Sequence, residues 1–400
     1  MAAGLCLLFA FAGVARAQDE VELLDGTKLE GRVVFEDERE LILIGANSKE
    51  RTIALDKVKS ARTRTRSLHA ALDHWDRLKE GDAVGLWELA AFCRDRGLSG
   101  EAQVFAWMVL RAEPEHAAAH ALLDHKLKGN AWYGQSGKIW MPLDRLHEVH
   151  KDFKDGWEFT SLHYRLQSNL PLERVLTMLI DLERFHRFFY GTLGAELKLR
   201  EVMEPMYAAV YADEKSFPKT ADNRKGYYTA MTNTLFVLAD QGLEPGLVYH
   251  EASHQLLICT ATRESRGRGS IPAWVNEGIA VYFEHSGKGL GGHATFEAGK
   301  PVRDMFAAHA TEKKPFDLSR MFSFASADFM ISSKATLKYA QSYSLVHFCL
   351  HGEGGKYRPG FLDYLRRAYM GDASSTSFRD AMKVREQDFE KAWHAYARAQ

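Results

Sequence analysis

Two histidines four residues apart, with an acidic residue beside the first, are the residues of this sequence best suited to chemistry. They are His250, Glu251 and His254, in the stretch GLVYHEASHQLLIC (residues 246–259). Positions i and i+4 of an α-helix lie one turn apart on the same face, so both imidazoles can bind one metal ion. Glu251 lies one residue further round and can reach a water molecule on that ion. The spacing predicts a zinc site with Glu251 as general base.

A catalytic zinc site also needs a third protein ligand and an open position. Glu277 lies in the apolar stretch IPAWVNEGIAVYFE (residues 271–284). The polar, glycine-rich segment 262–272 can turn the chain back and place a second helix beside the first. A buried carboxylate is costly unless it is neutralised, and a metal would neutralise it. The alternative is a surface glutamate at a helix start, which the preceding Trp274 and Val275 disfavour.

A stabiliser for the developing oxyanion is the next requirement. The stretch KYAQSYSLVHFCLHG (residues 338–352) predicts an amphipathic helix with Tyr339 and Tyr343 one turn apart. We expect the Tyr339 hydroxyl to donate to the oxyanion, which would contribute about 3 kcal/mol. Tyr343 is favoured as a packing residue and is kept, with Glu284, as a candidate for supporting the ligands.

Two other motifs are set aside. Gly287, Gly289 and Gly292 spell G-x-G-x-x-G, but they follow a predicted helix rather than a strand, so a dinucleotide site is not expected. A flexible loop near the cleft, acting as a lid, fits better. HEVH at 147–150 has an i, i+3 histidine spacing and lacks the zinc-binding pattern.

Composition limits the remaining function classes. The chain has 400 residues, 46% of them apolar, and a formal charge of −1. The length supports two or three domains. The near-zero net charge gives no overall electrostatic field that would attract nucleic acid. The basic run Lys57–Arg66 is interpreted as a solvated strand end or linker. The expected partners are a peptide or protein substrate, and a protein bound through the N-terminal barrel or the helical region described below.

The N-terminus predicts export. An apolar segment, Leu5–Val14, precedes Ala15-Arg16-Ala17, which is typical of a signal peptide cleaved after Ala17. The expected location is therefore periplasmic or secreted. No later window holds eighteen uninterrupted apolar residues, so no transmembrane span is expected in the mature chain.

The mature chain keeps Cys93, Cys259 and Cys349. An odd count permits one disulfide and one free thiol, and Cys259 with Cys349 would be the pair. Buried free thiols are the favoured alternative.

The order of predicted elements gives the fold class, α+β. Residues 19–66 alternate as four or five short antiparallel strands, which could close into a small SH3-like or Sm-like barrel. In the last domain, strands at 207–217 and 233–240 precede helices from Pro245 onward, which implies a small sheet over a helical body. The segment 234–240 could be the edge strand that aligns a peptide. The predicted units are a signal peptide (1–17), the barrel (19–66), a tetratricopeptide-like helical region (67–130), a Trp-rich connection (131–156) and the last domain (157–400).

His250-Glu251-x-x-His254 followed by WVNEG resembles the gluzincin metallopeptidases. It most resembles the exported bacterial peptidase MA-like proteins of unknown function, over about residues 160–400. The resemblance implies a zincin-like C-terminal domain and one Zn²⁺ held by both histidines and Glu277. It also implies Glu251 as base and Tyr339 as oxyanion donor, and hence peptide hydrolysis by attack of water activated at the metal.

The sequence departs from that pattern in three places. Four residues after the ligand glutamate, where several gluzincins have an acidic residue, stands Val281, so Glu284 is the candidate to orient a histidine. Tyr339 is not followed by the Lys and Gly of aminopeptidases. A G-x-M-E-N segment is missing too, which favours an endopeptidase.

Two alternatives stay open. One is a non-catalytic binding or assembly protein with a structural zinc, which the presence of Glu251 disfavours. The other is a zinc hydrolase of a non-peptide bond.

Overall fold

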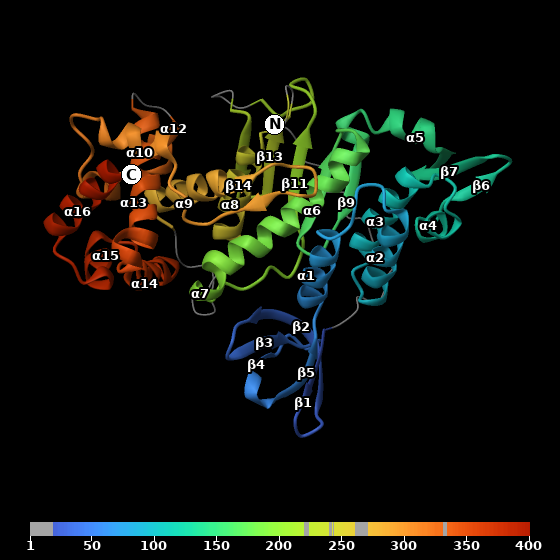
Figure 1. Ribbon diagram of the computed structural model, residues 1–400, viewed down its shortest axis with the longest axis horizontal. Helices are drawn as coiled ribbons and strands as arrows, with labels where there is room; N and C mark the ends of the chain where they lie inside the picture. Colours follow the sequence, from blue (N-terminus) through green and yellow to red (C-terminus); the bar gives the residue numbers. More distant parts are fainter. Residues whose placement is uncertain (1–18, 220–223, 240–241, 243, 261–270, 331–333) are drawn as a thin grey trace.

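The fold is mixed α+β, as the order of elements predicted. The computed structural model describes residues 19–219, 224–239, 242, 244–260, 271–330 and 334–400. The predicted signal peptide and most of the segment 262–272 lie outside the described residues. Figure 1 shows a central sheet with a helical body on one side, a second helical region on the other, and the N-terminal strands projecting below.

The N-terminal unit is an antiparallel sheet of five strands with its own small core. The strands are β1 (Asp19–Leu23), β2 (Lys28–Glu36), β3 (Glu40–Ile44), β4 (Glu50–Ala54) and β5 (Val58–Arg62), in the order β4-β3-β2-β1-β5. The five strands confirm the alternating pattern, and Val21, Leu41 and Ile53 supply buried core positions. Closure into a barrel is not seen, because β4 and β5 end the hydrogen-bonded order and are joined by a 3₁₀ turn, Leu55–Lys57.

The next region is helical, as its apolar spacing predicted, although its last helix ends at Leu122, before the predicted bound at 130. Its helices are α1 (Arg64–Trp75), α2 (Ala83–Asp95), α3 (Ser99–Ala112) and α4 (Ala117–Leu122). Gly100, at the start of α3, packs on the backbone of Thr160, where a Cβ would lie 1.6 Å from the carbonyl oxygen. Helix α3 is therefore fixed against the last domain by a contact that only glycine permits.

The expected connection holds regular structure that the sequence did not reveal. A three-stranded sheet, whose first strand lies in the last residues of the predicted helical region, leads into a short helix: β6 (Lys126–Lys128), β7 (Ala131–Ser136), β8 (Ile139–Pro142) and α5 (Leu143–Val149). Its strands are short and half-exposed, so no clear alternation of apolar and polar residues marks them.

The sheet of the last domain is mixed. Its strands are β9 (Trp157–Thr160), β10 (Tyr164–Ser168), β11 (Met206–Tyr211), β12 (Gly226–Thr229) and β13 (Thr234–Leu238), in the order β12-β13-β11-β10-β9. Strands β10, β11 and β13 run parallel, and the outer two are antiparallel to their neighbours. The prediction that 234–240 forms the edge strand is wrong, since β13 is paired on both sides. The edge is β12.

Helices cover the sheet and form the rest of the domain. Helices α6 (Leu172–Phe189) and α8 (Pro245–Cys259) pack on its strands, and α8 packs on α9 (Ala273–Ser286), which packs on α13 (Ala335–Gly355). The other helices and short strands are α7 (Ala195–Leu197), β14 (Gly287–Lys288), β15 (Thr295–Phe296), α10 (Arg303–Ala310), α11 (Leu318–Ser323), α12 (Ser326–Met330), α14 (Arg358–Tyr369), α15 (Ser375–Met382) and α16 (Glu386–Ala399).

One buried apolar core runs from Leu68 in α1 to Ala397 in α16. The helical region and the last domain therefore share a core rather than meeting through a linker. Cys93, Cys259 and Cys349 are free thiols, as the favoured alternative expected, but only Cys93 and Cys349 are buried, and Cys259 is partly exposed. Among the described residues, no helix combines the length and apolarity that crossing a membrane requires.

A buried group of ionisable side chains joins α6 to the N-terminal sheet. His163 Nδ1 lies 2.6 Å from Glu183 Oε2, and His163 Nε2 lies 3.4 Å from Glu201 Oε2. Arg32 of β2 reaches the same Glu201 oxygen at 3.5 Å. Burial alone would lower the pKa of His163, but the two carboxylates raise it to about 9. The ring is therefore a buried imidazolium that donates to both carboxylates.

Stability should fall as the pH rises toward 9, because His163 must stay protonated. Its pKa is raised above the ordinary value of 6.5, so its contribution is complete below about pH 6.5 and is lost as the pH passes about 9. The shift corresponds to about 3 kcal/mol of unfolding free energy. Urea unfolding at pH 6.5 and 9.5 would measure this loss in the native chain. His163→Gln should be less stable at pH 6.5 and show less further loss at 9.5; an equal loss in both chains would contradict the assignment.

Candidate metal centre

Helices α8 and α9 position the predicted ligands. Each starts at a proline boundary: Pro245 is the first residue of α8, and Pro272 precedes α9. Proline fixes a helix start at no cost in hydrogen bonds, since the first N–H groups have no partner within the helix. On the other side of α9, Gly278 faces α13, where a Cβ would lie 2.5 Å from the Ser342 carbonyl oxygen. That close approach holds α9, and Glu277 on it, in place.

The three predicted ligands converge. His250 Nε2 and His254 Nε2 are 3.1 Å apart, and each lies 3.6 Å from Glu277 Oε2. A tetrahedral zinc with ligands at about 2.0–2.1 Å separates its ligand atoms by about 3.3 Å. The observed separations match that value. Two imidazole nitrogens and a carboxylate oxygen aimed at one point fit a divalent cation better than a shared proton, which can bridge only one pair.

Glu284 orients the first histidine. Its Oε2 lies 2.8 Å from His250 Nδ1, so the other ring nitrogen faces Glu277. Glu284 comes two helical turns after Glu277 and shares its face, whereas Val281 is fully within the apolar core. Burial would lower the pKa of His250, but hydrogen bonds with Glu277 and Glu284 raise it to about 10. Glu284, predicted as a candidate to orient a histidine, thus lies where it can accept a hydrogen bond from His250 Nδ1–H.

Glu251 is buried beside the ligands, with an exposed fraction of 6%. Burial raises the pKa of its carboxyl to about 7, although the charge of His250 acts in the opposite direction. Edge strand β12 packs against it, since a Cβ on Gly226 would lie 3.3 Å from Glu251 Cγ and 2.8 Å from Leu247 Cδ1. Only glycine lets the strand approach the helix this closely.

The two tyrosines have different surroundings. The ring of Tyr339 lies 6.5 Å from that of His250, centroid to centroid, and it is half-buried. Burial, together with the charges of Glu277 and Glu251, raises the pKa of Tyr339, so its hydroxyl keeps its proton. Tyr343 instead uses its hydroxyl away from the ligands, accepting from Val302 N at 3.0 Å. The structure places the Tyr339 ring beside His250, whereas the Tyr343 hydroxyl is used in packing contacts.

The glycine-rich loop after α9 is docked, contrary to the lid expected for it. Buried Asp181 of α6 accepts hydrogen bonds from Gly291 N at 2.7 Å and Gly292 N at 2.8 Å. Trp75 of α1 donates to the Gly292 carbonyl at 2.5 Å, and Tyr249 donates to the Gly289 carbonyl at 3.0 Å. These contacts make the loop a bridge between the helical region and α8.

A second group with ligand-like spacing, His163, Glu183 and His186, is explained without a metal. Both ring nitrogens of His163 already face carboxylates, and the His186 ring stacks on it at 3.6 Å. The imidazolium satisfies the buried charge of Glu183. The HEVH histidines, His147 and His150, belong to neither group.

Two residues of the centre were not found from sequence. Gly226 is one, and a glycine opening a short strand gives only a weak signal of close approach. Arg224, just before β12, is the other, and its positive charge favours the ionised form of both Glu251 and Glu277, although burial keeps the pKa of Glu251 raised. Nothing in its sequence neighbourhood indicates that role.

Comparison with known proteins gives one finding. Residues 246–369 match a family described as a protein of unknown function, DUF1570. The match spans nearly all of α8 and the whole of α9, α13 and α14, and so includes His250, Glu277 and Tyr339. A comparison with curated proteins finds no match.

Proposed function

We propose that this protein is a zinc-dependent endopeptidase of the gluzincin type, with a zincin-like last domain. The observation that carries the proposal is the convergence of His250 Nε2, His254 Nε2 and Glu277 Oε2 at separations suited to one tetrahedral ion. Three protein ligands leave a fourth position for water or substrate. A structural zinc site would be expected to have four.

The buried carboxylate of Glu251 favours catalysis over a structural role. Zinc, when bound, lowers the pKa of a water molecule and polarises a carbonyl. Glu251 would take the proton of the attacking water and pass it to the leaving amine. Tyr339 would donate its hydroxyl proton in a hydrogen bond to the oxyanion. Edge strand β12, rather than β13, would align an extended peptide by main-chain hydrogen bonds.

Metal analysis and a peptide digest test the proposal together. Purified protein should contain about one zinc per chain and should cleave internal bonds in a mixed peptide library in a way that a chelator stops. Zinc without turnover would favour the structural-zinc alternative. Turnover of esters or other non-peptide bonds alone would favour the second alternative, and a protein with neither metal nor turnover would refute the proposal.

Glu284→Gln should weaken zinc binding about 10- to 100-fold, the usual effect of losing the partner of a metal-bound histidine. The amide keeps the shape of the side chain but removes the charge that holds His250 Nδ1–H. Competition with a chelator measures the affinity. Glu297→Gln is the matched control, because Glu297 is an exposed residue that pairs with Lys300 at 3.6 Å. Equal affinities for the two variants would show that Glu284 does not support the site.

A further inference from the structure

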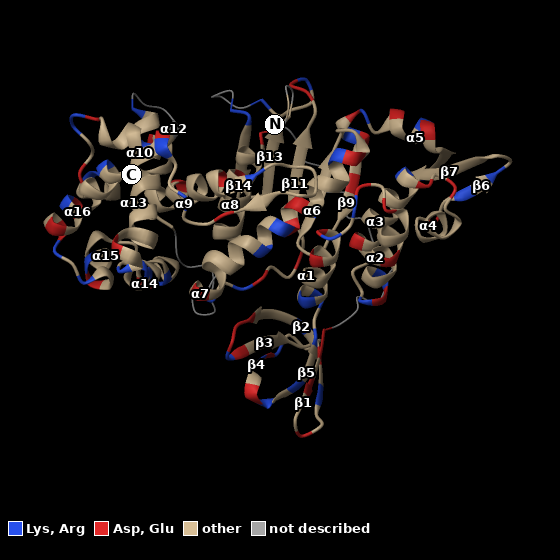
Figure 2. Ribbon diagram, in the orientation of Figure 1, with Lys and Arg blue, Asp and Glu red and all other residues tan. Residues whose placement is uncertain are grey.

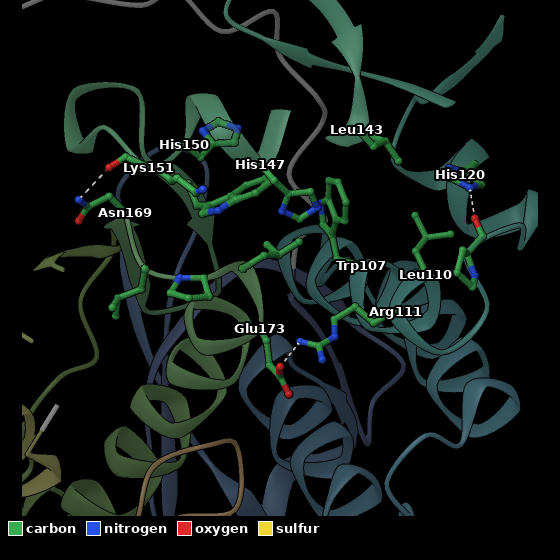
Figure 3. A pocket seen from close by; sticks show the side chains of 15 residues that line it. Trp107, Leu110, Arg111, His120, Leu143, His147, His150, Lys151, Asn169 and Glu173 are labelled. Carbon is green, nitrogen blue, oxygen red and sulfur yellow. Dashed lines mark hydrogen bonds and ion pairs between the residues drawn. The ribbon is translucent and has the colours of Figure 1, made fainter. Parts of the chain in front are cut away.

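A pocket of about 480 Å³ lies between α3, α5 and the start of α6 (Figure 3). It shares no residue with the metal centre. Trp157, which lines it, belongs to β9, at the opposite edge of the five-stranded sheet from β12. The pocket therefore lies where the helical region meets the last domain, and junctions of this kind commonly hold ligands.

The floor of the pocket is aromatic and aliphatic. Trp107 and Trp157 meet edge to face with ring centroids 5.7 Å apart, and both are buried. Leu110, Leu170 and Leu172 complete the buried surface. Such a floor favours a ligand with an apolar body, and the volume falls in the usual range for small organic ligands, about 300–1,000 Å³.

The rim carries cations whose present partners are easily exchanged. Arg111 pairs with Glu173 at 2.6 Å across the pocket, and Figure 3 shows Lys151 on the far side of the lining from them. Lys151 pairs with Glu148, which does not line the pocket, at 2.8 Å. Exposed pairs of this kind contribute little stability, so a ligand carboxylate could replace a partner at small cost.

The other titratable groups of the lining do not offset those cations. Burial lowers the pKa of His120, His147 and His150, so all three rings are neutral at pH 7. The lining thus has two basic side chains, Arg111 and Lys151, and a single carboxylate, Glu173. Charge and apolar surface together favour an amphipathic anion.

We propose that this pocket binds a ligand with an apolar body of about dipeptide size and one carboxylate group. Its body would lie on Trp107 and Trp157, and its carboxylate would reach Arg111 or Lys151 at the rim. A small organic acid and the carboxyl terminus of a peptide both have this chemistry. The site goes beyond the proposed hydrolysis, because binding here requires neither the metal nor cleavage.

Calorimetric titration of the full chain with three probes tests this site. The probes are N-acetyl-Phe-Leu, its C-terminal amide and 4-phenylbutyrate, and chromatography afterwards checks that they are intact. At least one acid should bind once per chain, and the amide should bind about tenfold more weakly than its acid. Tighter binding of N-acetyl-Phe-Leu would indicate the carboxyl terminus of a peptide as the ligand. Tighter binding of 4-phenylbutyrate would indicate a small organic acid. Failure of both acids to bind, or equal binding of the amide, would overturn the proposal whether or not the protein is a peptidase.

Substitutions in the lining test whether the ligand binds in this pocket. Arg111→Gln or Lys151→Gln should weaken binding of the acid about tenfold, and His147→Trp should block it by filling the opening. Lys154→Gln is the matched control, since Lys154 is 80% exposed and lies outside the lining. A thermal melt of each variant verifies folding. Unchanged binding in both charge variants, or an equal loss in the control, would refute the location.

Discussion

Glu251→Gln is expected to reduce peptide hydrolysis about 10³-fold while leaving the zinc content unchanged. A general base contributes about 10²- to 10⁴-fold to such a reaction. The amide fills the same buried space next to Gly226 but cannot accept the proton of the attacking water. Since Glu251 does not share the convergence point of the ligand atoms, the metal should stay. The turnover number and the metal content of the same preparation are the two measurements.

Two controls make the result specific. Glu297→Gln applies the same change to an exposed carboxylate and should leave turnover as in the native chain. A thermal melt of Glu251→Gln checks that folding is intact. Full turnover in a folded Glu251→Gln protein would remove the base assignment, and a simultaneous loss of zinc would mean that Glu251 is a ligand.

The sequence identified the three converging side chains because their pattern is local. His250 and His254 are one helical turn apart, and Glu277 is embedded in an apolar helix where a bare carboxylate would be costly. Helical spacing also explains Glu284. A family pattern pointed to the position of Val281, one turn after Glu277, but the side chain that reaches the His250 ring is Glu284, two turns after Glu277.

Long-range contacts could not be predicted in this way. The loop containing Gly291 was expected to move, yet it is held by Asp181, 110 residues earlier in the chain. Local composition shows that such a loop is rich in glycine, but it does not show which buried acceptor meets its N–H groups. The same holds for Arg224, whose effect on Glu251 depends entirely on how β12 packs against α8.

The edge strand was missed for a different reason. Strand β12 has four residues, Gly226–Thr229, and so is too short to show alternation. Strand β13 is strongly apolar, and four of its five residues are buried, because it pairs on both sides. An apolar run of this kind is typical of an interior strand. The composition of β13 therefore argues against an edge position, which leaves β12 as the edge strand.

Glu277→Gln is expected to lose the metal, with an effect larger than the 10- to 100-fold loss that follows removal of a supporting residue. The substitution would remove the only anionic ligand of the three, since His250 and His254 would bind zinc as neutral imidazoles. Chelator competition and metal analysis of the purified variant measure the loss. Glu251→Gln is the sharpest comparison, because it makes the same chemical change 26 residues earlier in the sequence and should keep its zinc.

The same pair of variants should differ in thermal stability. A ligand that binds only the folded chain stabilises it by about 4 kcal/mol at a thousand times its dissociation constant. A chelator should therefore lower the melting temperature of the native protein and of Glu251→Gln, but have little effect on Glu277→Gln, which has no metal to lose. If the chelator shifted all three equally, the metal would bind elsewhere. If it shifted none, the convergence of the three side chains at α8 and α9 would need an explanation that does not involve an ion.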